Sequence, residues 1–417
     1  MGKMNKTIKA GSAVWKKIDS FGGNTTSPVL TAWRPCPVCG GFECRTLLAF
    51  DDFQFYGDSA QLPKRIQVQQ VQCSTCQAIF MNPGYSETGL RVLFAAAGNS
   101  FRSRPEHQVA QVTWLQQRGL AAPGQALLDV GCYDGHFLNM LPAHVRKSGV
   151  DMDAAAIERG RSLGLDLIAG AFEDFRLSAQ PDVITMFHVL EHLADPYKTL
   201  RNLRRNSHAE TRLIIEVPVI EKGFTNDLNG FLSIQHSTHF SFNSLKLIMQ
   251  RAGWQILDGE TMSYNGYRIV TKPGTDNVVD VKAGAMADRV TALRYLQSYF
   301  QNLADVGEKI GKWPNTSRAV IWGAGAHTEV LYQTTEYFRQ DRDREYIMVD
   351  SAVTEPVMTW RGLHAYSPKA VLADIDWSDC ALVISSYGWQ DAIEQDALKA
   401  GVPQSAIRKI YGHVTTY

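Results

Sequence analysis

Four residues of types found in nucleoside-binding sites lie within a short stretch in the middle of the chain. An apolar run ends in Asp129, and the turn that follows holds Gly131 and Gly135. Asp151 ends the next apolar stretch, SGVD. Glycine removes a Cβ where backbone must approach a ligand. A strand, a glycine-rich turn and a second strand that ends in an acid are typical of a nucleoside-binding half-sheet, in which the acid binds the ribose hydroxyls.

The acids in this turn favour S-adenosylmethionine over a dinucleotide. A dinucleotide site needs G-x-G-x-x-G, so that a pyrophosphate lies at a helix N-terminus. Here Asp134 lies inside the turn and Asp129 just before it. Their carboxylates suit the ammonium group of a methionine moiety and repel a pyrophosphate. The alternative is an ordinary strand, turn and helix in which the glycines serve only the turn.

The remaining cofactor contacts are expected further along the chain. The segment Leu167–Phe175 is predicted as a third strand, with Phe172 covering the adenine and Glu173 or Asp174 accepting a hydrogen bond from its amino group. The predicted cofactor-binding residues are Asp129, Gly131, Tyr133, Gly135, Asp151, Met152, Phe172, Glu173 and His188.

Four of the seven cysteines form two C-x-x-C pairs, Cys36 with Cys39 and Cys73 with Cys76. Two such turns place four thiolates at the corners of a tetrahedron, so the pattern predicts a structural zinc site rather than disulfides. Four thiolates close the coordination shell, so this zinc is expected to stabilise a small domain and not to catalyse. The alternatives are two unrelated turns or a site that has lost its metal.

The elements that must position these residues alternate between strands and helices. Asp182–Phe187 and Leu213–Pro218 read as the fourth and fifth strands of a buried parallel sheet. The predicted fold class is α/β: a Rossmann-like domain with a zinc-binding module before it and a doubly wound α/β domain after it. The expected divisions are a flexible tail (1–33), the zinc module (34–95), the Rossmann-like domain (96–272), a helical linker (273–312) and the C-terminal domain (313–417).

The C-terminal third repeats the pattern of strand and glycine-rich turn. Gly323, Gly325 and Asp350 resemble a dinucleotide site, but the motif GAGAHT lacks its final glycine, so nucleotide binding there is left open. In the linker, five apolar side chains are expected to share one helical face that packs between the domains: Val290, Leu293, Leu296, Phe300 and Leu303.

Composition narrows the class of protein. The 417 residues include 42 basic and 42 acidic side chains. A protein that binds phosphate backbones usually has a basic excess, so neutrality argues against a nucleic-acid substrate. The sequence has no apolar run long enough to span a membrane and no secretory h-region, so we expect a cytoplasmic protein.

The order of these motifs resembles the class I S-adenosylmethionine-dependent methyltransferases over residues 105–272, and the segment HVLEHL (188–193) is typical of that superfamily. The cysteine pairs, followed by QAIFMNPGY and a short helix, resemble the module that precedes the methyltransferase domain of sugar C-methyltransferases. C-terminal domains like this one also occur there. The resemblance implies an S-adenosylmethionine cofactor and a sugar or nucleotide-sugar substrate.

The resemblance breaks at the catalytic motif. Sugar C-methyltransferases carry Tyr-His-Glu-His shortly before Phe-Ser, and the matching positions here are Ser233, Ile234, Gln235 and His236. The tyrosine and glutamate that serve deprotonation of carbon are absent. We therefore expect O-methylation, with His236 as the first candidate base and His239 as the second. The alternative for both histidines is a structural role in their loop.

Three other functions are also compatible with the sequence. They are sugar C-methylation by an altered base, methylation of ribosomal RNA by an enzyme with a zinc ribbon, and a non-catalytic scaffold that binds S-adenosylmethionine.

Overall fold

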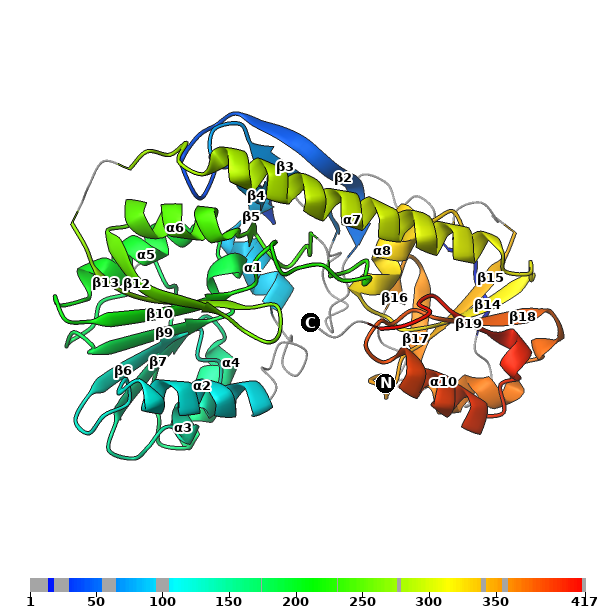
Figure 1. Ribbon diagram of the computed structural model, residues 1–417. Helices are drawn as coiled ribbons and strands as arrows, with labels where there is room; N and C mark the ends of the chain where they lie inside the picture. The colour runs from blue at the N-terminus through cyan, green and yellow to red at the C-terminus, as the bar shows by residue number, and fades with distance from the viewer. Residues whose placement is uncertain are drawn as a thin grey trace, which may run out of the picture.

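The computed structural model describes residues 14–18, 30–54, 65–94, 105–173, 175–230, 232–275, 279–338, 343–354 and 359–414. Two α/β sheets lie at opposite ends of the molecule, and the long helix α7 (Ala285–Gly311) runs between them alongside β2 and β3 (Figure 1). The predicted α/β fold class is confirmed.

The central domain has a seven-stranded sheet in the order β12-β13-β10-β9-β6-β7-β8. Every neighbouring pair from β10 to β8 is parallel, and β13 is antiparallel to both β10 and β12. The strands are β6 (Ala126–Val130), β7 (Arg146–Asp151), β8 (Asp166–Ala169), β9 (Val183–Phe187), β10 (Arg212–Val217), β12 (Trp254–Thr261) and β13 (Tyr267–Pro273). The third strand ends at Ala169, shorter than predicted, because the chain turns away at Gly170.

Short polar side chains cap three helices of this domain, α4, α5 and α6. Asp153 accepts a hydrogen bond from Ala156 N, and Ser241 forms a reciprocal capping box with Ser244. Such caps satisfy amide groups that the helix leaves unpaired. The elements are α2 (Pro105–Gln117), α3 (His136–Met140), α4 (Ala154–Ser162), η1 (Leu190–His192), α5 (Pro196–Arg205) and α6 (Phe242–Arg251).

The N-terminal sheet includes one strand from the segment that connects β10 to α6 in the central domain. Its order is β11-β4-β3-β2, and β11 (Thr238–His239) pairs with β4 (Ile79–Met81). The other strands are β2 (Cys44–Gln54) and β3 (Arg65–Cys73); β1 (Thr31–Ala32) pairs with β5 (Gly84–Tyr85), and α1 (Glu87–Phe94) follows. The segment that carries His236 and His239 is therefore fixed to the cysteine-bearing module.

The C-terminal sheet has the order β16-β17-β15-β14-β18-β19 and is parallel except for β16. Its strands are β14 (Arg318–Trp322), β15 (Glu345–Val349), β16 (Thr359–Trp360), β17 (Leu363–Tyr366), β18 (Cys380–Ile384) and β19 (Ile407–Lys409). The helices around it are α8 (Ala326–Thr334), α9 (Pro368–Val371), η2 (Leu372–Asp374), η3 (Trp377–Asp379), α10 (Gln390–Lys399) and η4 (Gln404–Ala406).

Part of the expected N-terminal tail is ordered against the rest of the molecule. Lys16 and Tyr346 exchange backbone hydrogen bonds of 3.1 and 2.7 Å, which attaches this segment to β15. Leu30 is buried at 5% exposure. Residues 1–13 and 19–29, also assigned to the tail, lie outside the described residues.

The buried face of α7 agrees with the predicted one only in part. Leu296 is buried as predicted and Leu303 is half-buried, whereas Val290, Leu293 and Phe300 are 42%, 51% and 49% exposed. The helix also buries Ala292, Tyr295, Tyr299 and Val306. Tyrosines can line a buried face because their hydroxyls can still bond: Tyr295 accepts from Leu232 N at 3.2 Å. A pattern that counted only aliphatic side chains and phenylalanine missed these tyrosines.

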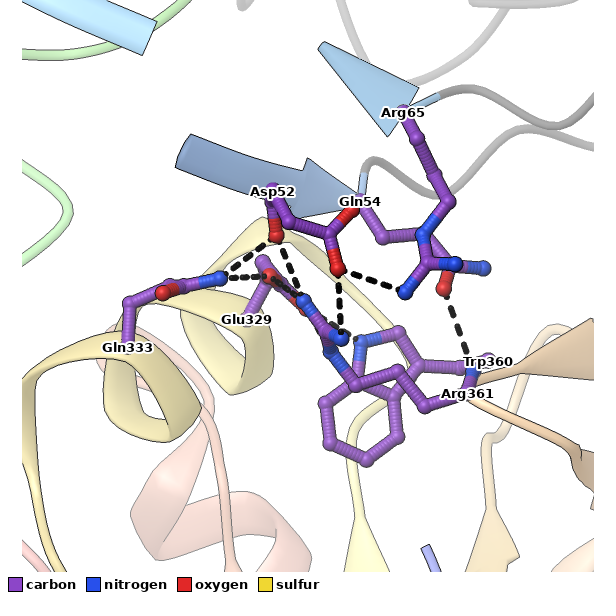
Figure 2. Close-up of polar contacts among 7 residues, drawn as sticks. All are labelled: Asp52, Gln54, Arg65, Glu329, Gln333, Trp360 and Arg361. Carbon is purple, nitrogen blue, oxygen red and sulfur yellow. Dashed lines mark hydrogen bonds and ion pairs between the residues drawn. The ribbon is translucent and has the colours of Figure 1, made fainter. Parts of the chain in front are cut away.

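A polar network joins the β2–β3 hairpin to the C-terminal domain (Figure 2). Arg361 donates to Glu329 at 2.5 Å and to the carbonyl of Asp52 at 2.7 Å, while Arg65 pairs with the Asp52 carboxylate at 2.7 Å. Gln333 also donates to the Asp52 carbonyl at 2.7 Å. The Glu329 side chain is completely buried. The hairpin is thereby fixed to the second α/β domain.

Candidate functional site

The predicted cofactor turn lies where the strand order of the central sheet reverses, between β7 and β9 on either side of β6. Ligands bind at this point in open α/β sheets. Gly131, Tyr133 and Gly135 all have positive φ angles, of 81°, 50° and 75°. A Cβ at Gly131 would collide with the Val189 side chain. The turn therefore needs glycine for its conformation and for close packing against the segment after β9.

Asp151 holds the turn in place from the end of β7. Its carboxylate accepts hydrogen bonds from Tyr133 N at 2.9 Å and from Asp153 N at 2.8 Å. Each oxygen keeps a second lone pair for a further donor, such as a ribose hydroxyl. The acid that the sequence assigned to the ribose thus also shapes the turn.

Asp129 lies one residue before the end of β6 and is 5% exposed. Burial raises the pKa of its carboxyl to about 7, the hydrogen bond from the Thr185 hydroxyl at 2.6 Å opposes the shift, and the charge of Asp151 adds to it. A cation placed at this turn would stabilise the ionised form of Asp129.

Four other predicted cofactor residues differ in exposure. Tyr133 accepts from Arg159 at 2.9 Å through its hydroxyl and is half-buried. Met152 and Glu173 are half-buried, whereas Phe172 is 4% exposed and packs in the hydrophobic core. Asp174, the alternative to Glu173, lies outside the described residues.

His188 lies directly after β9 with a positive φ of 55°. A left-handed conformation is uncommon for histidine and marks a position that the surroundings constrain. Burial by itself lowers the pKa of His188, but the carboxylates of Glu191 at 3.5 Å and Glu216 at 3.0 Å outweigh burial and raise this pKa to about 10. His188 is therefore a cation at neutral pH.

Glu216, at the carboxyl end of β10, connects His188 to side chains that the sequence did not single out. Arg268 on β13 pairs with it at 2.6 Å, and the Tyr264 hydroxyl donates to it at 2.5 Å. Burial raises the pKa of Glu216, and the hydrogen bond with His188 and the charges of His188 and Arg268 lower it to about 2. Tyr264 and Arg268 lie about 50 positions after the fifth strand in the sequence. No local motif therefore indicates that they contact Glu216.

Three further side chains gather at the same strand ends: Glu191 and His192 on η1, and His236 on the loop before β11. One ligand atom of each lies within 4.8 Å of the others. His192 Nδ1 lies 2.8 Å from the carbonyl of Gln235, and the His192 and His236 rings are 5.0 Å apart. Burial, and then the charges of His192, His239 and His188, hold the pKa of His236 well below its usual value.

His239, the second candidate base, lies on β11 and is 6% exposed. Its Nε2 lies 3.2 Å from Oε1 of Gln70 on β3, and burial lowers its pKa to about 3. This histidine joins the two strands of the N-terminal sheet on either side of β4. Its ring lies 5.9 Å from that of His236, but its hydrogen-bond partner lies in the N-terminal sheet.

The four cysteines of the two C-x-x-C pairs meet, as predicted, in one cluster. Cys36 and Cys76 lie 3.6 Å apart between sulfurs, and Cys39 and Cys73 lie 3.5 Å apart. Tetrahedral Zn–S bonds of about 2.3 Å place sulfurs roughly 3.8 Å apart. The donor set and its size therefore fit a zinc ion.

The two turns of this cluster share one conformation. The amide of Gly40 donates to the carbonyl of Cys36 at 2.8 Å, and the amide of Gln77 donates to that of Cys73 at 3.1 Å. Gly40 and Gln77 both have positive φ, of 79° and 64°. Backbone amides of Gly41 and Thr75 also point at cluster sulfurs, each at 3.4 Å. Such hydrogen bonds stabilise thiolates around a metal.

Comparison with known proteins identifies a methyltransferase domain in the central part of the chain. Residues 104–258 match a family model described as a methyltransferase domain. Ubiquinone biosynthesis O-methyltransferases of Bordetella parapertussis and Bordetella bronchiseptica are each 29% identical over 111 residues, which is 24% of this chain and 45% of theirs. The chain thus spans less than half the length of these relatives.

Solved structures of similar fold include an S-adenosylmethionine-dependent methyltransferase from Clostridium acetobutylicum, with 11% identity, a TM-score of 0.35 and coverage of 44% of this chain and 97% of that one. The magnesium protoporphyrin IX methyltransferase of Synechocystis has 15% identity, a TM-score of 0.37 and coverage of 45% of this chain and 100% of that one.

Within the described residues, no helix is both long and apolar enough to cross a membrane.

Proposed function

We propose that this chain, which carries a class I S-adenosylmethionine-dependent methyltransferase domain, transfers the methyl group to a hydroxyl oxygen of a sugar, either nucleotide-linked or part of a glycan. One observation carries the proposal. The cofactor turn and the histidine group occupy the same edge of the sheet, where Val189, the neighbour of His188, packs on Gly131. A methyl donor bound at the turn would lie beside side chains that handle protons.

The cofactor is assigned to the turn and its two acids. Asp151 binds the ribose hydroxyls while it holds Tyr133, and Asp129 faces the ammonium of the methionine moiety. The sulfonium is already activated, so the protein needs to align the acceptor oxygen with the methyl carbon and sulfur and to remove one proton. An O–CH₃ bond forms, the C–S bond breaks, and S-adenosylhomocysteine leaves.

His236 is the residue that we propose receives the acceptor proton. Its lowered pKa keeps the imidazole neutral, which is the form that accepts a proton. It is half-buried, whereas the second candidate, His239, is buried and paired with Gln70. His188 is already protonated at neutral pH and suits a role in charge stabilisation rather than as a base.

Carbon methylation is the second candidate because a tyrosine, a glutamate and a histidine do meet in this structure. Tyr264, Glu216 and His188 form one network, although they stand elsewhere in the sequence than the family motif. Their charge states favour the first candidate. Burial and the nearby Glu216 charge raise the pKa of Tyr264 well above its ordinary value, so the phenol keeps its proton. The Glu216 carboxylate is committed to its buried ion pair with Arg268 at 2.6 Å.

The substrate class is supported by the layout of the whole chain. A four-cysteine module before the methyltransferase domain and a mostly parallel α/β sheet after it resemble the organisation of the sugar C-methyltransferases. The O-methyltransferase named among the relatives agrees with an oxygen acceptor. For the cysteine cluster we propose a structural zinc ion, since four thiolates leave no position for a substrate.

The test is turnover with a panel of nucleotide sugars, followed by release of S-adenosylhomocysteine and by NMR of the product. We expect a methoxy sugar, at a rate strongly reduced in His236→Asn and retained in His208→Gln, which removes a histidine at the other end of β9. Turnover on RNA or a phenol with none on any sugar would overturn the substrate class. Cofactor binding without turnover on any acceptor would favour a scaffold.

A further inference from the structure

A second group of metal-binding side chains lies apart from the cysteines. Glu191, His192 and His236 offer one carboxylate oxygen and two imidazole nitrogens, all within 4.8 Å of one another. The Glu191 side chain is 1% exposed, and both histidines are half-buried. Two imidazoles and a carboxylate form a donor set that suits first-row divalent metals.

Glu191 has a carboxylate oxygen that its surroundings leave unsatisfied. Oε1 lies 3.5 Å from Nδ1 of His188 and 3.7 Å from Nε2 of His192. Oε2 is buried and accepts no hydrogen bond from any residue that the structure describes. A buried carboxylate oxygen without a partner is costly, and a bound cation would remove that cost.

His192 is already oriented as a metal ligand. Its Nδ1 lies 2.8 Å from the Gln235 carbonyl, which can only accept, so Nδ1 carries the hydrogen. Nε2, the nitrogen on the side of Glu191, is then the one that can bind a metal. Histidine ligands are commonly held by such a hydrogen bond from their other nitrogen to a carbonyl.

We propose that Glu191, His192 and His236 bind a divalent transition-metal cation at the carboxyl end of β9, separate from the ion of the cysteine cluster. Metal–ligand bonds of about 2.0–2.2 Å allow two ligand atoms to lie up to roughly 4.3 Å apart. The three groups therefore close on an ion through side-chain shifts on the order of 1 Å. Three protein ligands leave coordination positions for an acceptor oxygen or water.

This inference rests on the proposed function and changes one detail of it. With the cation bound, His236 is a ligand, and the acceptor hydroxyl is acidified by direct coordination to the metal. Its proton leaves to solvent, the O–CH₃ bond forms and the C–S bond of the sulfonium breaks. The cation then promotes loss of the acceptor proton, which the free imidazole of His236 accepts when no cation is bound.

Titration with Mn²⁺, followed by its EPR signal, tests the site in the full chain with zinc already bound. Thiolates select zinc over manganese, so Mn²⁺ reports the nitrogen and oxygen ligands. We expect one Mn²⁺ per chain, bound at least about tenfold more weakly in both Glu191→Gln and His192→Gln. The matched control is His208→Gln, which removes a histidine 3.3 Å from Asp182 and should bind Mn²⁺ like the wild type.

Zinc content and S-adenosylhomocysteine binding, measured on the same variants, verify that each variant is folded. No bound Mn²⁺ or Co²⁺, or equal binding by the wild type and both cluster variants, overturns the metal site. Methyl transfer is a separate readout. Mn²⁺ binding without methylation of any acceptor supports the metal site and rejects the proposed function. Full methyl transfer after the divalent cation has been removed from this site rejects only the catalytic role of the metal.

Discussion

Single carboxylates in this protein take their roles from their partners. Asp151 accepts two backbone amides and keeps the cofactor turn in its left-handed conformation. Glu216 instead lies between the cations of Arg268 and His188. The first arrangement leaves lone pairs for a ligand, whereas the second commits the carboxylate to a buried ionic network. Residue type alone would not distinguish these two roles.

Asp151→Asn should weaken S-adenosylhomocysteine binding by roughly 10- to 100-fold. The amide NH₂ would face a backbone N–H where the carboxylate accepts a hydrogen bond, and a hydrogen bond to a charged group contributes about 1.5–3 kcal/mol. Isothermal titration calorimetry measures the change. Asp182→Asn is the matched control, since Asp182 accepts from Ala126 N at 2.8 Å at the other end of the sheet. Equal affinities of the two variants would contradict the assignment.

His188 should make stability depend on pH on the alkaline side. Its pKa is about 10 in the folded protein, against an ordinary value of 6.5, so its contribution is complete below about pH 6.5 and is lost as the pH rises through 10. We expect the free energy of unfolding to fall more steeply over this range in the wild type than in His188→Gln. Parallel curves for the two proteins would contradict the ionic network, as would an NMR titration with a midpoint near 6.5.

Among the elements, β11 is the one that connects the cysteine module to the candidate site. It pairs with β4, three residues after Cys76, and its chain continues from His236. Arg34, just before the first cysteine turn, donates to the carbonyl of Ser237 at 2.6 Å and also to that of Ala194. The module thus holds both segments that carry the histidines.

Removal of zinc should therefore affect both stability and activity. We expect one equivalent of zinc per chain, and a lower melting temperature after chelation or in Cys73→Ser, because the four thiolates lose the ion that joins them. Methyl transfer should fall with it, since β11 is no longer fixed. Differential scanning fluorimetry with zinc quantification measures this effect. Cys380→Ser, a buried cysteine of the C-terminal sheet, is the control that should keep its zinc.

Over the whole molecule, the cysteine module serves as the connection between two α/β domains. The sheet that begins at the cysteines ends in a hairpin at the C-terminal domain, where Asp52 meets Arg361 and Gln333 (Figure 2). Helix α7, of 27 residues and roughly 40 Å, runs alongside this hairpin (Figure 1). The two domains therefore share a continuous support rather than a single linker.

Glu329→Gln should destabilise the protein by about 3–5 kcal/mol, because the buried guanidinium of Arg361 loses its buried counter-charge and keeps only the partly exposed carboxylate of Asp52 at 3.4 Å. The Arg361–Glu329 pair lies at 2.5 Å, with side chains 1% and 0% exposed. Urea denaturation of the full chain measures the loss. Glu308→Gln breaks an exposed pair with Lys312 and should cost less than about 1 kcal/mol. A similar small loss in both variants would show that the buried pair does not fix the domains.

Several parts of the site could be predicted from the sequence because their geometry is local. The cysteine turns and the turn from Gly131 to Gly135 each span a few residues, and backbone conformation requires glycine at most of their left-handed positions. The buried face of α7 was predicted correctly at Leu296 but wrongly at Val290, Leu293 and Phe300, since the hydrogen bond that lets a tyrosine be buried there comes from a distant segment. Nothing in the sequence indicated the roles of Tyr264 and Arg268, because only the antiparallel pairing of β13 with β10 brings them beside Glu216.

The sequence by itself determined the α/β class, the cysteine cluster and the acids of the cofactor turn, because short apolar strands and tight turns depend on neighbouring residues. Only the tertiary structure decided which histidines meet and which charges are buried. His192 bonds to a carbonyl 43 residues away, and Arg361 to one 309 residues away. Such contacts arise from the packing of sheets, and packing of distant segments follows from the burial of the whole core rather than from local spacing.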